Sequence, residues 1–126
     1  MTHLLDTDCI INHLRGRTEI IPESDKTFAM SVVTMGELLY GAERSDNPKK
    51  TRAAISIFQS EFQVSIMDIT EQIVARYASI KAALSKRGVL IEDFDLLIAA
   101  TAITHNLTLV TANTKHFKRI KGLLLA

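Results

Sequence analysis

Four oxygen-bearing side chains stand where a folded chain could bring them together. Asp6 follows the apolar run "THLL", and Glu37 comes shortly after the run "TFAMSV". Asp95 lies near the start of a long apolar segment, and Asn113 follows the run "LTLVT". If the three carboxylates converge, their mutual repulsion has to be relieved by protonation or by a bound cation.

A hard divalent ion is the cation that suits such a set of oxygen donors. Magnesium and manganese prefer carboxylates and water, and they keep coordination positions open for a substrate phosphate. An ion bound there could activate water as a nucleophile and neutralise charge on a phosphate in the transition state. The chemistry implied by these residues is therefore hydrolysis of a phosphodiester.

Each of these side chains also has a structural interpretation as a helix cap. The capping alternatives are Asp6 or Asp8 before a short helix, Glu37 as the capping-box partner of Thr34, Asp93 before the apolar helix, and Asn113 before a last short helix. The observation that favours a site is the common placement at strand ends, because four unrelated caps would not need it.

Short apolar runs of strand length alternate with helical patterns along the chain. The expected strands are 2–6, 27–32, 62–67 and 107–111, and the expected helices are 9–15, 34–45, 47–62, 70–88 and 92–106. Pro48 suits a first helical turn, and Gly88 suits a left-handed C-terminal cap. This alternation predicts an α/β fold with a parallel sheet covered on both faces and a ligand crevice at the carboxyl ends of its strands.

Composition limits the class of protein. With 126 residues, 47% hydrophobic content and a net charge of +1, residues 1–126 are expected to form one globular domain. Cys9 is the only cysteine, and neither a leader nor an 18-residue apolar segment is found, so we expect a soluble cytoplasmic protein without a membrane partner. The histidines lack zinc-site spacing; they are His3, His13, His105 and His116.

An ordered set of motifs covers nearly the whole chain. With "LLDTDCIINHLRG", "SVVTMGELLYGAERS" and "LIEDFDLLIAATAITHNLTLVTANTKHF", the sequence resembles the VapC toxins of bacterial toxin–antitoxin systems, which are PIN-domain ribonucleases. The resemblance implies a three-layer α/β/α fold, a mostly parallel sheet and a Mg²⁺- or Mn²⁺-dependent endoribonuclease. Asp6 and Asp95 match the metal-binding aspartates and Glu37 the active-site glutamate. Asn113 stands where many members have a fourth acid.

The resemblance extends to the surroundings of the site and to partners. Hydroxyl positions around the family's site match Thr7, Ser31, Thr34 and Thr111. Three positions depart from the family pattern: Asp8 replaces a frequent asparagine, and Leu90 and Glu92 replace a proline and a glycine. The implied partners are a VapB-like antitoxin whose tail covers the active site, a second copy of the chain, and RNA. The segment "YGAERS" makes the anticodon region of initiator tRNA the leading candidate substrate.

RNA binding has to come from local groups, because the net charge is small. The candidate phosphate contacts are Arg15, Arg17, Arg44, Lys49, Lys50, Arg52, Lys115, Lys118, Arg119 and Lys121. Aromatic residues make up only 6% of the chain, which favours a structured RNA recognised by shape and backbone over extensive base stacking. Two alternatives remain open: a PIN-like module that binds RNA or a partner without catalysis, and a receiver-type phospho-acceptor domain with Asp68 as its acceptor.

Overall fold

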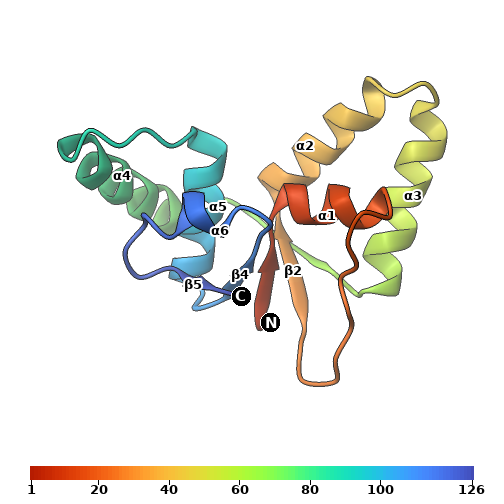
Figure 1. The fold of residues 1–126 in the computed structure, drawn as a ribbon, viewed down its shortest axis with the longest axis horizontal. Coiled ribbons are helices and arrows are strands. Elements are labelled where there is room, and N and C mark those ends of the chain that lie inside the picture. Colours follow the sequence, from red (N-terminus) through yellow and green to blue (C-terminus); the bar gives the residue numbers. More distant parts are fainter.

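A five-stranded sheet forms the centre of the computed structural model, which describes residues 1–126 (Figure 1). The strands are β1 (His3–Leu5), β2 (Phe28–Ser31), β3 (Ser65–Met67), β4 (Thr108–Val110) and β5 (Leu124–Leu125). Their order is β3-β2-β1-β4-β5, and every neighbouring pair is parallel. The predicted parallel α/β sheet is therefore confirmed.

Six helices cover the two faces of this sheet. They are α1 (Thr7–Leu14), α2 (Val32–Glu43), α3 (Pro48–Glu61), α4 (Glu71–Lys86), α5 (Asp93–Thr104) and α6 (Thr114–Phe117). In Figure 1, α1, α2 and α3 lie on one side of the strands, and α4, α5 and α6 lie on the other. This arrangement is the three-layer α/β/α fold that was expected. No helix is both long and apolar enough to cross a membrane.

Side-chain alternation along the strands divides the core into two halves. Leu4 and Ala29 belong to the apolar cluster that includes α4 and α5, whereas Leu5, Phe28 and Met30 belong to the cluster with α1, α2 and α3. Successive residues of a strand point to opposite faces, so adjacent residues in β1 and β2 supply both clusters. Because helices cover both faces of the sheet, the strand sequences are continuous apolar runs.

The order of the strands determines where a site can form. β1 lies in the middle of the sheet, with β2 on one side and β4 on the other. The chain therefore leaves β1 in one direction and later returns to its opposite side, which creates a topological switch point at the carboxyl end of β1. Asp6 follows β1 directly, and Thr111 follows β4.

The structure corrects the predicted bounds of α2 and β3 and adds one strand that was not predicted. α2 begins at Val32 instead of residue 34, because the Ser31 hydroxyl caps it by accepting the Val33 N–H at 3.1 Å. β3 is shorter than the predicted 62–67, because Phe62 ends α3 and Gln63 adopts a φ of +50°. β5 was not predicted, since two residues at the edge of a sheet have no recognisable periodicity.

Other local signals agree with the structure. Pro48 is the first residue of α3, and Gly88 follows α4 with a φ of +71°, a conformation that glycine adopts without steric cost. Ile73 and Leu84 on the predicted inner face of α4 are buried. α5 has buried residues on several sides of the helix, as its nearly continuous apolar sequence predicts.

Candidate active site

Asp6 is a buried carboxylate at the switch point, with 3% of its surface exposed. It caps α1: its Oδ1 accepts the Thr7 N–H at 2.9 Å. Its Oδ2 accepts the hydroxyl of Thr111, which follows β4, at 2.8 Å. The capping interpretation is thus correct for Asp6, but the carboxylate also joins two neighbouring strand ends, which a cap alone does not require.

Burial raises the pKa of Asp6 from 3.8 to about 6. The value of about 6 includes smaller effects: the negative charges of Asp95 and Asp8 also raise the pKa, while the hydrogen bonds from Thr111 and Thr7 lower it. Desolvation is the largest effect because a charged carboxylate loses its hydration in the interior. An ionised Asp6 without a nearby counter-charge therefore destabilises the folded state.

Glu37 is linked to α1 through a pair of threonine hydroxyls. The Thr7 Oγ1 lies 2.7 Å from Glu37 Oε1 and 3.1 Å from Thr34 Oγ1. A hydroxyl has one hydrogen to donate, so Thr7 donates to the carboxylate at the shorter distance and accepts from Thr34. The capping-box interpretation of Thr34 and Glu37 is wrong, because α2 has already begun two residues before Thr34 and Ser31 is its cap.

Replacing Thr7 by Val removes this hydroxyl while preserving the shape of the side chain. The pKa of Glu37, already raised chiefly by burial, should rise further because the hydrogen bond from Thr7 opposes the shift. For the RNA cleavage that the sequence motifs imply, we expect a pH profile whose acidic limb moves to higher pH, with the rate at neutral pH reduced about 10-fold. Thr34→Val should move the limb less, since Thr34 contacts Glu37 only through Thr7. Identical profiles for Thr7→Val and the wild type would contradict this role.

Asp95 on α5 is held by a histidine and an arginine from the far end of the chain. His116 Nε2 lies 3.2 Å from Asp95 Oδ2, and the Arg119 guanidinium contacts His116 Nδ1 at 2.7 Å. Arginine can only donate hydrogen bonds, so Nδ1 is the acceptor and the ring hydrogen of neutral His116 lies on Nε2. His116 therefore donates to Asp95.

On sequence alone, this histidine lacks zinc-site spacing, and no partner was predicted for it. The contact joins α6 to α5 across 21 positions of the chain. The "KHF" segment has no spacing relationship to Asp95 that could have indicated it. Asp95 lies in the first turn of α5, and the capping alternative there was Asp93; the N-cap residue is instead Glu92, whose side chain makes no capping hydrogen bond.

The acids form an electrostatically coupled group. Burial is the main cause of the raised pKa values of Glu37 and Asp95, and the exposed carboxylates of Asp8 and Glu92 raise both further. Asp95 also raises the pKa values of Asp6 and Glu37. The three predicted acids are thus brought within electrostatic range, and all three resist ionisation.

The structure does not bring these acids into contact as a ligand set. No three His, Cys, Asp or Glu side chains form a group that could hold a metal ion. The expectation of fully converging carboxylates is therefore corrected to a looser arrangement. The donor chemistry still suits a hard cation, since Asp95 Oδ1 and Glu37 Oε2 have no hydrogen-bond partner within the protein.

The remaining sequence candidates lie outside the group. Asp93 does not cap α5 but accepts hydrogen bonds from Tyr77 and Lys81, each at 2.7 Å, and Lys81 lowers the pKa of Asp93. Asn113 is exposed before α6, and its side chain makes no capping hydrogen bond. Asp68 is exposed after β3, an edge strand separated from β1 by β2.

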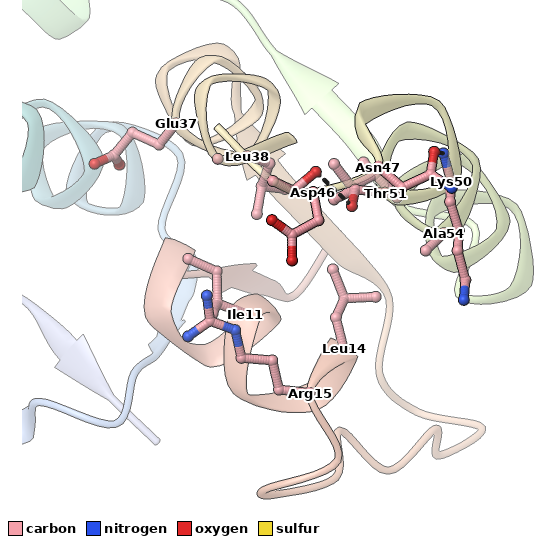
Figure 2. A pocket seen from close by; sticks show the side chains of 13 residues that line it. Ile11, Leu14, Arg15, Glu37, Leu38, Asp46, Asn47, Lys50, Thr51 and Ala54 are labelled. Carbon is pink, nitrogen blue, oxygen red and sulfur yellow. Dashed lines mark hydrogen bonds between the residues drawn. The ribbon is translucent and has the colours of Figure 1, made fainter. Parts of the chain in front are cut away.

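Two hollows adjoin the acids. One encloses about 690 Å³ and is lined by α1, α2 and the start of α5, with Thr7, Asp8 and Glu37 on its wall. The other encloses about 460 Å³ between α1, α2 and α3 (Figure 2). Arg15 and Glu37 line both, so the two hollows form neighbouring surfaces beside the carboxylates.

A parallel α/β domain with buried acids at its switch point is a class of structure that can support hydrolytic chemistry at the carboxyl edge of the sheet. The PIN domain family model matches residues 3–123. The chain therefore belongs to the PIN-domain family, as the sequence motifs indicated. This membership rules out the receiver-type alternative and its acceptor at Asp68.

The relatives share most of their length with this chain. Ribonuclease VapC1 of Rickettsia felis is 40% identical, covering 95% of this chain and 91% of the relative. The tRNA(fMet)-specific endonuclease VapC of Shigella flexneri is 32% identical, covering 95% and 92%. Among solved structures, VapBC2 of Rickettsia felis bound to a promoter DNA fragment superposes with a TM-score of 0.89 at 31% identity, covering 100% of this chain and 98% of the other.

Proposed function

We propose that this protein is a metal-dependent endoribonuclease and the toxin of a VapBC-type toxin–antitoxin pair. The observation that carries the proposal is the group of Asp6, Glu37 and Asp95 at the carboxyl edge of the sheet, in a chain of the PIN-domain family. Neighbouring carboxyl groups that resist ionisation are stabilised in their charged form by a bound cation. Relatives named ribonucleases support the same activity.

Asp6 and Asp95 would hold the ion, and Glu37 would bind or position the attacking water. A bound Mg²⁺ or Mn²⁺ would supply an activated water and neutralise charge on the phosphate. Thr111 and Thr7 orient the carboxylates of Asp6 and Glu37 through hydrogen bonds of 2.8 and 2.7 Å. His116 does the same for Asp95. Asn113, which is exposed before α6, is proposed to help orient the site.

RNA is the proposed substrate, with initiator tRNA the leading candidate. The relatives from Shigella flexneri and Salmonella typhimurium are named tRNA(fMet)-specific endonucleases and are each 32% identical. Similarity at this level supports the same class of substrate without specifying the cleavage position. An enzyme acting on tRNA works in the cytoplasm, where we place this protein, with residues 1–126 acting as one domain.

A VapB-like antitoxin is the proposed protein partner, because VapBC complexes are among the similar solved structures. A second copy of the chain is a further proposed partner. Apolar residues of α2 and α3 are the candidates for such surfaces. The structure buries Leu38, Ile55 and Phe58 in the core, leaving Leu39 and Tyr40 exposed. The groove between α1, α2 and α3 (Figure 2) has an apolar wall and is our candidate for the antitoxin.

The function is tested by incubating antitoxin-free protein with total bacterial RNA in Mg²⁺, Mn²⁺ or EDTA and mapping new RNA ends. We expect discrete cuts with either ion and none in EDTA. Asp95→Asn should reduce cleavage at least 1,000-fold, because Asp95 binds the ion directly. A purified initiator tRNA assayed beside an elongator tRNA then tests the candidate substrate.

Asp93→Asn is the matched control, since it makes the same chemical change two residues earlier on α5. Asp93 is exposed and paired with Lys81, so this variant should cleave at the wild-type rate. Folded protein that makes no cuts with either ion would contradict the proposal and favour the non-catalytic module. Equal losses in both variants would show that Asp95 has no special role.

A further inference from the structure

Two exposed aromatic side chains line the larger hollow beside the acids. Tyr40 on α2 is 63% exposed and Phe94 on α5 is 51% exposed, and both contribute to the wall that includes Glu37. The other aromatic residues, apart from histidine, are buried or half-buried; they are Phe28, Phe58, Phe62, Tyr77 and Phe117. The exposed aromatic surface of the chain is thus concentrated at one place.

Two cations without an ion-pair partner line the same hollow. Arg15 and Arg44 form no ion pair and donate no side-chain hydrogen bond within the chain, and both contribute to the wall with Tyr40. The Arg44 guanidinium lies over the Tyr40 ring, 5.5 Å from its centre. Aromatic rings beside guanidinium groups that make no ion pair are complementary to a nucleotide, which combines a flat base with a phosphate.

We propose that this hollow binds one unpaired nucleotide of the RNA next to the bond that is cut. Its base stacks on Tyr40 or Phe94, and its flanking phosphate contacts Arg44 or Arg15. A volume of about 690 Å³ is within the range of small-molecule sites. The carboxylates of Asp8 and Glu37 on the same wall repel phosphate, which favours placing the phosphate at the arginines.

This inference rests on the proposed function and deepens it by naming the side chains that would hold one unpaired nucleotide. In a double helix the bases are stacked on one another and their faces are covered, so only an unpaired base can lie on Tyr40 or Phe94. The low aromatic content suggested recognition by shape and backbone. The proposed site adds a base contact to that expectation, because the two exposed aromatic residues line the same hollow as Glu37.

The test uses a short single-stranded RNA carrying 2-aminopurine, whose fluorescence changes when the base stacks. Asp95→Asn protein prevents cleavage, and the absence of Trp from the chain allows excitation where the protein does not absorb. We expect a fluorescence change with the single strand and none with the same sequence as a duplex. In the Asp95→Asn background, the further substitutions Tyr40→Leu and Phe94→Leu should each raise the Kd for the single strand about 5-fold or more.

Matched variants separate stacking from general surface effects. Tyr40→Phe, added to Asp95→Asn, retains the ring, so its Kd for the RNA should equal that of Asp95→Asn alone. Leu39→Ala changes a neighbouring exposed residue that lines neither hollow and should have no effect. Arg44→Gln should lower the slope of log Kd against log salt by about 0.7, the value for one phosphate contact on a single strand. In otherwise wild-type protein, Tyr40→Leu should raise KM more than it lowers kcat.

Each outcome has a defined meaning. Equal affinity for single strand and duplex, or an unchanged Kd in both leucine variants, would overturn the nucleotide site while leaving the nuclease intact. Leucine variants that keep RNA affinity but lose antitoxin binding would reassign the surface to a protein partner. Stacking by Asp95→Asn protein, together with no cleavage by the wild type, would support this site and contradict the proposed function.

Discussion

Replacing Asp6 by Asn is expected to abolish RNA cleavage and, in the absence of metal, to increase the stability of the fold. The loss of cleavage follows from removing a proposed metal ligand, and we expect it to exceed 1,000-fold. The gain in stability follows from burial, because Asp6 is 3% exposed and its pKa is raised to about 6. An amide of the same shape carries no charge to desolvate.

The sign of the pH dependence of stability follows from the raised pKa of Asp6. The folded protein binds a proton at Asp6 more tightly than the unfolded chain, whose carboxyl has a pKa of 3.8. Below pH 3.8 both states are protonated, and Asp6 has no effect on the free energy of unfolding. Between pH 3.8 and about 6 the unfolded state ionises first, so stability falls as pH rises. Above pH 6 the free energy of unfolding of the wild type has fallen by roughly 3 kcal/mol, and Asp6→Asn should largely restore this loss.

Urea unfolding in EDTA across this pH range measures the effect. The free energy of unfolding of Asp6→Asn minus that of the wild type should grow with pH and then level off above the pKa of Asp6. Asp93→Asn serves as the control, because Asp93 is exposed and its pKa is shifted in the opposite direction. Adding Mg²⁺ or Mn²⁺ should stabilise the wild type and not Asp6→Asn, through binding to the folded state. An Asp6→Asn protein that is less stable than the wild type at pH 8 would contradict the cost assigned to this carboxylate.

Replacing Arg119 by Leu is expected to weaken Mn²⁺ binding about 10- to 100-fold, although it removes a positive charge near the site. Electrostatics alone predicts the opposite, since losing a cation favours the binding of another. The expected weakening arises because Arg119 fixes the hydrogen of His116 on Nε2, from which it is donated to Asp95. Without Arg119 the ring can change tautomer, and Asp95 loses a fixed orientation.

Calorimetry with Mn²⁺ and ¹⁵N NMR of the histidine ring measure the two parts of this prediction. In the wild type the His116 ring should show a protonated Nε2 and an unprotonated Nδ1, and Arg119→Leu should show a mixture. Lys118→Leu is the matched control, because it removes the same charge one residue earlier from an exposed side chain. Equal Mn²⁺ affinities for Arg119→Leu and Lys118→Leu would exclude a positioning role for Arg119.

Much of the fold follows from local patterns that the sequence displays directly. Apolar runs alternating with helical periodicity predicted the parallel sheet, and Pro48 and Gly88 marked helix ends by their backbone preferences. The errors occurred where two local interpretations were equally good. Phe62 suits a strand as well as a helix end, and only its packing against Phe58 and His13 places it at the end of α3.

The order of apolar runs and acids along the chain indicated which acids follow strands or open helices, and the motifs indicated the family. The contacts that hold these acids arise only in the folded chain: Thr111 reaches Asp6 across 105 positions, and His116 reaches Asp95 across 21. Burial likewise belongs to the packed state, so the raised pKa of Asp6 could not be anticipated from its neighbours in the chain. Sequence patterns report periodicity within one element, whereas contacts between elements depend on the order in which the strands assemble.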